Sequence, residues 1–486
     1  MKFDGEEEKK SQIFNAPRIL IAAPKSGSGK TTITCALLQF LKNHGKKPLA
    51  FKCGPDFIDP MFHRQVLGIQ STNLDSFFCG DELLKEIFLR DLKGSGEDSF
   101  ALIEGVMGLF DGLGGRSIKA SSYDIARITE TPILLVIDAE GASRSIIPLI
   151  KGFLDYDKEN SGLKNKEGKS ENLIKGIFLN KVSKSSFLLL KSLIEEELTL
   201  PVLGYFPKDS ENVLKSRHLG LVLPGEISNL QKQIQKSAEV LEETLDFNAL
   251  EAISKVALRG KELSADFFPA EDVAKNTGEK VRIAVAWDEA FCFYYRENLR
   301  LLEKFGAKIE YFSPLHDKIL PQDIGGILLG GGYPELYAAQ LESNISMRES
   351  IKSAVEKGAA VVAECGGFMY LQEKLVPEGG ESYRMCGVIK GECRYTGKLV
   401  RFGYAEFVPK NGACREILKK AVKGHEFHYF DSTGNGADFT AEKPLSKKAW
   451  DCMIFTPKML AGYPHLYYPS NPEVAKWFVN SCRKER

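Results

Sequence analysis

A glycine-rich stretch near the N-terminus has the residue types of a phosphate-binding loop. It reads Pro-Lys-Ser-Gly-Ser-Gly-Lys-Thr-Thr over residues 24–32, after a short apolar run and before apolar residues at helical spacing. In a P-loop, backbone N–H groups at a helix N-terminus surround phosphate oxygens, and a lysine reaches the terminal phosphates. The standard pattern begins with glycine where this chain has Pro24, and the role of Lys25, where some P-loop ATPases carry a second lysine, stays open. The residues predicted to bind a nucleotide are Gly27, Ser28, Gly29, Lys30, Thr31 and Thr32.

Hard oxygen ligands for Mg²⁺ are available beside this loop. Asp56 follows the apolar run Pro48–Lys52, and Glu104 ends the run Phe100–Glu104. Residues at the carboxyl ends of parallel strands face the ligand crevice of such a sheet, and Mg²⁺ prefers oxygen ligands. Thr31, Asp56 and Glu104 are therefore predicted to hold Mg²⁺.

A second set of residues has the types of a cysteine nucleophile and its partners. Cys365 follows an apolar run and precedes two glycines and a helix. A thiol on such a turn lies at a helix N-terminus, where the dipole lowers its pKa. Backbone N–H groups of Gly332 and Gly366 are predicted to stabilise an oxyanion. The nucleophile needs a base, for which we choose His465; a structural role is the alternative for this histidine.

A further pair of histidines, His425 and His428, lies in the sequence His-Glu-Phe-His. The spacing resembles that of a metal-binding pair, but no third ligand is evident in the sequence. We therefore interpret the pair as lining a substrate site or a domain interface.

Two α/β blocks must position these residues. Continuous apolar runs alternate with helical patterns, which predicts parallel sheets covered on both faces. The predicted strands are residues 18–23, 48–52, 100–104, 133–138 and 174–180 in the first block, and 281–288, 307–312, 326–329 and 359–363 in the second. Residues 291–305 are predicted to be helical, and the polar segment 155–172 to be a surface insertion or locally disordered. The predicted divisions are a tail (1–16), a P-loop domain (17–225), a helical connector and linker (226–280) and a second α/β domain (281–486).

Composition excludes several classes of protein. The 486 residues carry 65 Lys and Arg against 65 Asp and Glu, so a global basic field for nucleic acid or an anionic membrane is ruled out. No apolar run reaches the roughly 18 residues that span a bilayer, and the charged N-terminus does not look like a signal peptide. The ten cysteines include no Cys-x-x-Cys pair, so we expect buried thiols and a cytoplasmic location.

The order and spacing of several motifs resemble the cobyrinate a,c-diamide synthases, and more broadly the glutamine-dependent corrinoid amidases. The resemblance extends from Arg18 to Ala475. It rests on the motifs SGSGKTT, FKCGPDFIDPMFH, NLDSF, EGVMGLFDG, LGGGYPEL, AECGGFMYL, GHEFHY and YPHLYYPSNP.

This resemblance implies a dethiobiotin synthetase-like P-loop domain and a class I glutamine amidotransferase-like domain. The first would use ATP and Mg²⁺ to activate a carboxylate of a tetrapyrrole, cobyrinate, as an acyl phosphate. The second would release ammonia from glutamine through Cys365 and His465, for internal transfer. The implied carboxylates also include a catalytic Asp111. The residues implied on the substrate side are Asp59, His63 and Asp75.

The sequence departs from the amidotransferase pattern at one position and leaves alternatives open. Tyr467 stands where a class I amidotransferase has the glutamate two residues after its histidine, and Glu426 is a candidate replacement. Nickel-sirohydrochlorin, on the route to coenzyme F430, and hydrogenobyrinate are alternative substrates, and cobyric acid synthase ranks lower. A P-loop switch of the partitioning type and a standalone glutaminase are the competing classes. A homodimer is left open.

Overall fold

The computed structural model divides into two compact units, Met1–Phe267 and Phe268–Arg486. It describes residues 11–14, 16–93, 96, 98–162, 164, 168, 170–208, 227–256, 258–261, 280–410 and 412–483. Most of the predicted tail (1–10), the predicted boundary near 225 and most of the predicted linker (262–279) lie outside the described residues. No helix within the described ranges is both long enough and apolar enough to cross a bilayer.

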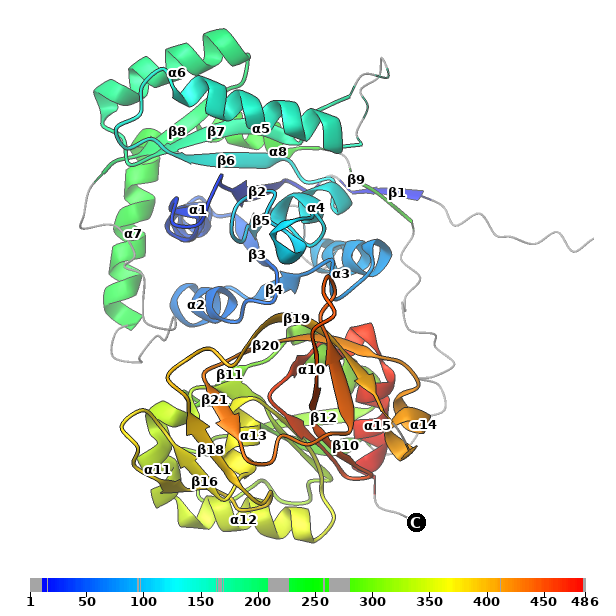
Figure 1. Ribbon diagram of the computed structural model, residues 1–486. Helices are drawn as coiled ribbons and strands as arrows, with labels where there is room; N and C mark the ends of the chain where they lie inside the picture. Colours follow the sequence, from blue (N-terminus) through cyan, green and yellow to red (C-terminus); the bar gives the residue numbers. More distant parts are fainter. Residues whose placement is uncertain are drawn as a thin grey trace, which may run out of the picture. The chain divides into compact units, whose positions relative to one another are not determined.

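The first unit is built on a seven-stranded sheet in which every neighbouring pair is parallel (Figure 1). Its order is β4-β3-β5-β2-β6-β7-β8, so the strand that leads into the P-loop lies at the centre. The strands are β2 (Arg18–Ala22), β3 (Lys47–Cys53), β4 (Ser71–Leu74), β5 (Ser99–Glu104), β6 (Ile133–Asp138), β7 (Ile174–Asn180) and β8 (Val202–Phe206).

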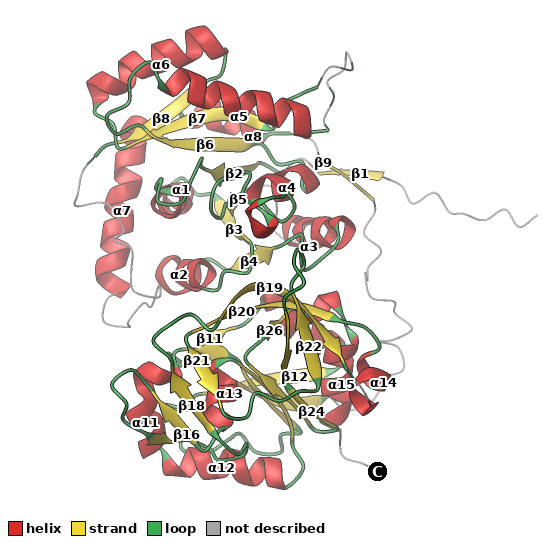
Figure 2. Cartoon of the chain, viewed as in Figure 1, coloured by secondary structure: helices red, strands yellow, loops and turns green. Residues whose placement is uncertain are grey.

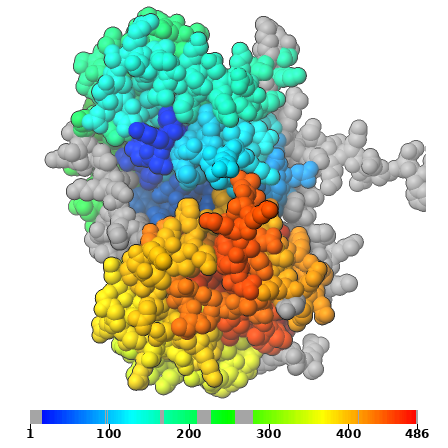
Figure 3. All heavy atoms as spheres, in the orientation of Figure 1, coloured from blue at the N-terminus to red at the C-terminus, as the bar shows by residue number. Residues whose placement is uncertain are grey.

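Alternate strand residues face two layers of helices. Ala50 of β3 belongs to a core cluster with α1, α2, α7 and α8, whereas Phe51 packs against Phe88 of α3 with ring centroids 5.0 Å apart. In the space-filling view, the cyan-green residues of α5 and α6 form an outer layer of this unit (Figure 3). The helices are α1 (Lys30–Asn43), α2 (Ile58–Leu67), α3 (Asp81–Lys93), α4 (Ser122–Ile128), α5 (Ile146–Asn160), α6 (Lys184–Leu198), α7 (Ile227–Thr244) and α8 (Phe247–Ser254).

The ends of the first unit are more structured than the sequence suggests. Part of the predicted tail is a strand, β1 (Ser11–Phe14), which pairs antiparallel with β9 (Leu258–Lys261). In the predicted connector, Leu230 of α7 and Leu250 of α8 are fully buried in the core of this unit. These two helices therefore belong to the P-loop unit.

The polar segment Asp155–Asn172 is only partly a surface insertion, because α5 continues through Asn160. Asp157 is fully buried. It accepts hydrogen bonds from the Tyr123 hydroxyl and the Ile174 backbone N–H, both at 2.8 Å. Composition alone could not predict that this aspartate is buried, because its hydrogen-bond partners lie elsewhere in the chain.

The second unit contains a six-stranded sheet with the order β12-β10-β13-β15-β25-β24. Its first five strands are parallel, and β24 pairs antiparallel with β25. The strands are β10 (Val281–Ala286), β12 (Ala307–Phe312), β13 (Gly326–Leu329), β15 (Ala360–Glu364), β24 (Ile454–Thr456) and β25 (Met459–Gly462).

Helices and smaller sheets surround this sheet, and the short strands of the second unit are drawn in yellow in Figure 2. The helices are α10 (Arg296–Lys304), α11 (Ala338–Ser343), α12 (Ile345–Glu356), α13 (Gly366–Leu371), α14 (Gly412–Leu418) and α15 (Glu473–Ser481). One sheet is formed by β19 (Arg401–Pro409), β20 (Val422–His428), β22 (Phe439–Glu442), β23 (Ala449–Cys452) and β26 (His465–Leu466). Another is formed by β16 (Lys374–Val376), β17 (Tyr383–Arg384), β18 (Glu392–Tyr395) and β21 (Phe430–Ser432).

The prediction of one helix over residues 291–305 was wrong in its first part. Residues Phe291–Phe293 form strand β11, which pairs with β14 (Gly331–Gly332), and the helix α10 begins only at Arg296. Long-range pairing with the glycine strand overrides the local helical pattern. The consequence for the site is that β11 holds the predicted oxyanion glycine in place.

Candidate active sites

The P-loop turns from β2 into α1 on two glycines with left-handed backbone. Gly27 has φ 78° and Gly29 has φ 96°, a region that glycine adopts without steric cost. Asn180, at the end of β7, donates its Nδ2 hydrogen to the Ser28 carbonyl at 2.8 Å. A Cβ atom at Gly29 would lie 2.1 Å from that nitrogen, so both the backbone and the space require glycine there.

The helix that follows the loop begins with the three predicted phosphate ligands Lys30, Thr31 and Thr32. The Lys30 ammonium donates to the Met107 carbonyl at 2.6 Å and lies 3.4 Å from the Lys25 carbonyl. Burial, and then the charge of Lys52, lower the pKa of Lys30. An arriving phosphate would offset both effects, which fits the predicted role of this lysine.

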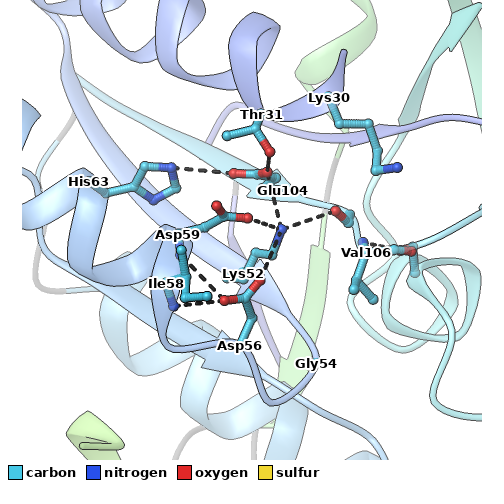
Figure 4. A network of polar contacts seen from close by, with 12 residues as sticks. Lys30, Thr31, Lys52, Gly54, Asp56, Ile58, Asp59, His63, Glu104 and Val106 are labelled. Atoms are coloured by element: carbon cyan, nitrogen blue, oxygen red, sulfur yellow. Dashed lines mark hydrogen bonds and ion pairs between the residues drawn. The ribbon is translucent and has the colours of Figure 1, made fainter. Parts of the chain in front are cut away.

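A buried cluster of charges lies next to the first turn of α1, and Lys52 of β3 is at its centre (Figure 4). The Lys52 ammonium lies 2.5 Å from Asp59, 3.1 Å from Glu104 and 3.8 Å from Asp56. Only 3% of Lys52 is exposed. This lysine was not among the predicted site residues, although a charged residue inside the apolar stretch Phe-Lys-Cys was a signal.

Three carboxylates around one ammonium shift each other's pKa values. Burial lowers the pKa of Lys52, but Glu104, Asp59 and Asp56 together raise it well above its ordinary value. Burial also opposes ionisation of Glu104, yet Lys52 and His63 hold the pKa of Glu104 well below its ordinary value. Burial and the charge of Glu104 raise the pKa of Asp59. The cluster therefore carries more carboxylates than its lysine neutralises and favours an additional cation.

The predicted metal ligands are only partly brought together. Thr31 donates its hydroxyl to Glu104 at 2.6 Å. Asp56 instead accepts hydrogen bonds from the backbone N–H groups of Ile58 (2.7 Å) and Asp59 (3.3 Å), and Lys52 lies between it and Glu104. Of the three predicted metal ligands, Thr31 and Glu104 are therefore the two that lie in direct hydrogen-bond contact.

The predicted substrate-side and catalytic residues fall into two groups. His63 is fully buried with its Nε2 3.3 Å from Glu104, so it belongs to the cluster, as Asp59 does. Asp75 is also buried, but it accepts hydrogen bonds from the backbone N–H groups of Phe77 and Phe78 and thereby stabilises a turn. Asp111 is exposed and accepts from the Gly108 N–H at 2.9 Å, one residue from the Met107 carbonyl that binds Lys30.

In the second unit, Cys365 lies on a strained turn between β15 and α13. Its φ of 47° and ψ of −104° are unusual for a residue with a side chain. Its N–H donates to the Gly462 carbonyl at 2.8 Å, which fixes the turn to the adjacent strand β25. The turn has the place in the fold that the sequence predicts for the nucleophile.

The expected lowering of the thiol pKa does not occur. Burial, and then the charge of Glu335, raise the pKa of Cys365 well above its ordinary value, and the Gly366 N–H offsets only part of this. The helix that directly follows the thiol, α13, is short and spans six residues. A neutral thiol in this environment requires a base that removes its proton during attack.

The glycines predicted to form the oxyanion site adjoin each other. A Cβ atom at Gly366 would lie 3.2 Å from the Gly332 backbone nitrogen. A Cβ atom at Gly331 would lie 2.4 Å from the His465 ring. The predicted base, the strand β14 and the residue after the nucleophile therefore converge.

The histidines of the second unit form a buried group around His465. The rings of His425 and His465 stack with centroids 5.0 Å apart, and the Tyr295 hydroxyl lies 3.0 Å from His425 Nδ1. Burial, followed by the charges of His425 and His428, lowers the pKa of His465 well below its ordinary value. A neutral imidazole is the state that accepts a proton from a thiol.

Glu426, the candidate replacement, and Tyr467, which stands where a glutamate is expected, make different contacts. A Glu426 oxygen lies 3.6 Å from His428 Nε2, whereas the ring of Tyr467 packs edge-on against Tyr295 with centroids 5.4 Å apart. In the part of the chain that the structure describes, no three His, Cys, Asp or Glu side chains are arranged to hold a metal ion by themselves.

Comparison with known proteins accounts for both units. The protein-family model described as a CobQ/CobB/MinD/ParA nucleotide binding domain matches residues 19–221. The family model of a CobB/CobQ-like glutamine amidotransferase domain matches residues 282–472. The nucleotide-binding unit and the amidotransferase unit in one chain define a glutamine-dependent amidating ligase.

Proteins named cobyrinate a,c-diamide synthase are similar to this chain over nearly its whole length. The one from Caldanaerobacter subterraneus subsp. tengcongensis is 39% identical, with 95% of this chain and 98% of the relative covered. Those from Thermoplasma volcanium and Salmonella typhimurium are 37% and 35% identical, each with 96% of this chain and 98% of the relative covered. The chain belongs to the cobyrinate a,c-diamide synthase family.

Proposed function

We propose that this chain converts the a and c carboxylates of cobyrinate to amides, with ATP and glutamine as co-substrates, in cobalamin biosynthesis. The observation that carries the proposal is that one chain keeps both chemical centres, the Lys52 cluster beside the P-loop and the Cys365 turn beside His465. A switch ATPase needs no cysteine centre, and a standalone glutaminase needs no intact P-loop.

In the first unit, the P-loop and Lys30 bind the phosphates of ATP, and charge neutralisation there is the main contribution to phosphoryl transfer. The substrate carboxylate attacks the γ-phosphorus, ADP leaves, and an acyl phosphate forms. We assign Asp59, His63 and Lys52 to the substrate carboxylate, because these side chains gather at one place beside Thr31. Asp111 is assigned to the loop whose Met107 carbonyl accepts a hydrogen bond from Lys30, and Asp75 to the turn that shapes the substrate side.

We propose that Thr31 and Glu104 hold Mg²⁺. The excess of carboxylates over ammonium groups in the cluster fits a cation, and the pair supplies the hard oxygens that Mg²⁺ prefers. Mg²⁺ usually takes one or two carboxylates together with substrate phosphates and water. When bound, it supplies charge neutralisation for the transferring phosphoryl group.

In the second unit, His465 takes the Cys365 proton as the sulfur attacks the glutamine amide carbon. The N–H groups of Gly332 and Gly366 donate to the oxyanion, ammonia leaves with the proton from His465, and water hydrolyses the thioester to glutamate. Ammonia then attacks the acyl phosphate carbon, which yields the amide, phosphate and a proton. A cytoplasmic location fits the ten cysteines, all of which are buried and none of which forms a disulfide.

A paired mass-spectrometric assay tests the proposal. The chain, ATP, Mg²⁺ and glutamine are incubated separately with cobyrinate and with nickel-sirohydrochlorin, and conversions of carboxyl to amide are counted. Two conversions on cobyrinate alone support the proposal. Conversion of nickel-sirohydrochlorin alone assigns the same chemistry to the other tetrapyrrole, and hydrolysis of ATP without any amidation contradicts the amidation of both.

A further inference from the structure

The residue before the nucleophile is a buried glutamate. Glu364 ends β15, is 8% exposed and lies among apolar residues and tyrosines. Cys365 lies on the turn that directly follows this strand. The reaction described above does not use the Glu364 side chain.

The hydrogen-bond partners of this carboxyl belong to the segment that carries the base. The Tyr468 hydroxyl donates to Glu364 Oε1 at 3.1 Å, and a second donor, the Leu466 backbone N–H, lies close enough to lower the pKa of the same carboxyl. Leu466 directly follows His465, and Tyr468 comes two residues later. The carboxyl thus connects the residue before the nucleophile to the residue after the base.

A second side chain holds the same segment from the other side. Asn298 of α10 donates its Nδ2 hydrogen to the Leu466 carbonyl and accepts from the Tyr468 N–H, each at 2.8 Å. The Leu466 carbonyl and the backbone N–H of Tyr468 are therefore both fixed by one buried side chain. The backbone on either side of His465 has little freedom, because β26 also pairs with β20.

We propose that Glu364 is a positioning residue for the amidase reaction: its carboxyl fixes the strand end that carries Cys365 to the segment that carries His465. This inference rests on the amidase chemistry proposed for the second unit. Glu364 acts on the segment around His465 through Tyr468 and Leu466, which is a different role from that of the glutamate absent at Tyr467.

The carboxyl acts in its neutral form. Burial raises the pKa of Glu364 to about 8, against smaller opposite effects of Tyr468 and Leu466. A neutral acid holds the two donors without placing a negative charge near the thiol, whose ionisation burial already opposes. An amide has the same shape and the same acceptor, so glutamine is a conservative replacement at this position.

The test compares Glu364→Gln and Glu364→Leu in the full-length chain, with Glu442→Leu on the exposed end of β22 as the control. Glutamate release gives kcat and KM for glutamine, and intact mass gives the rate at which 6-diazo-5-oxo-L-norleucine, an electrophilic glutamine analogue, modifies Cys365. We expect Glu364→Leu to lower kcat and the modification rate by about tenfold or more with KM within about twofold. Glu364→Gln and the control are expected to stay within about threefold of the wild type.

The other possible results each contradict one part of this proposal. Full kcat in Glu364→Leu overturns the positioning role, and an equal loss in Glu364→Gln overturns the claim that a neutral acceptor is enough. A wild-type chain that releases no glutamate refutes the amidase function itself. If Glu364→Leu does not fold, Tyr468→Phe removes one of the two donors and is expected to lower kcat several-fold; unchanged kcat there overturns the inference.

Discussion

Replacement of Lys52 by methionine tests the charge cluster of the first unit most strongly. The ammonium is almost fully buried and neutralises carboxylates at 2.5, 3.1 and 3.8 Å. Removal of one partner from a buried ion pair costs about 3–5 kcal/mol, because the remaining charge is left uncompensated. Lys52→Met is therefore expected to lower the free energy of unfolding of this unit by that amount at pH 7.

The loss in the free energy of unfolding depends on pH, and the pKa shift of Glu104 determines the direction of this dependence. In the wild type, the pKa of Glu104 is held below its ordinary value, so its stabilisation is present above that value and is lost as the pH falls through the folded pKa. In the variant, one carboxyl must be protonated on folding in addition to Asp59, whose pKa is already raised in the wild type. For an ordinary pKa of about 4.3, this costs about 3.7 kcal/mol at pH 7 and about 1.6 kcal/mol at pH 5.5. The deficit of the variant therefore shrinks by about 2 kcal/mol between these pH values.

Urea denaturation followed by far-UV circular dichroism measures this loss. The three tryptophans, Trp287, Trp450 and Trp477, all lie in the second unit, so their fluorescence reports that unit separately. Lys85→Met is the control, because Lys85 pairs with Glu130 at 2.7 Å in a partly exposed setting worth about 1 kcal/mol or less. Equal losses in the two variants, or a deficit of Lys52→Met that does not change with pH, would show that Lys52 does not hold the buried carboxylates in their charged form.

Three further substitutions separate the two centres. Cys365→Ala is expected to abolish amidation with glutamine and to keep amidation with added ammonia; product formation from glutamine would contradict the assignment of the nucleophile. Lys30→Ala is expected to abolish both routes, as product assays with each nitrogen source show, and retained ammonia-dependent amidation would contradict the P-loop role. Gly29→Ala places a Cβ atom 2.1 Å from Asn180 at φ 96° and is expected to weaken ATP binding at least tenfold by calorimetry; unchanged affinity would disprove this steric argument.

Local sequence patterns predicted the elements that carry both centres. The strand–glycine–helix pattern around Lys30 and the strand–cysteine–glycine pattern around Cys365 are continuous in the sequence, and the structure has strands and helices at those places. Gly332 was singled out in the sequence because its neighbours are also glycines. Patterns of this kind depend on residues within one or two turns of each other.

Residues that depend on distant partners were not found in this way. Lys52 takes its role from Asp59 and Glu104, and Glu364 takes its role from Leu466 and Tyr468. The low thiol pKa expected at a helix N-terminus was overridden by burial and by a nearby glutamate, which act through three-dimensional packing. The strand β11 was missed for the same reason, because its pairing partner lies about forty residues away.

Isotope transfer from glutamine tests the central claim, that the two centres of this chain cooperate in one amidation reaction. The chain is incubated with cobyrinate, ATP, Mg²⁺ and glutamine labelled with ¹⁵N at its amide, in the presence of unlabelled ammonium at equal concentration. We expect a diamide in which both new nitrogens carry the label. A product that carries mainly unlabelled nitrogen, or no amide at all while ATP and glutamine are both hydrolysed, would show that the two centres do not cooperate in this way.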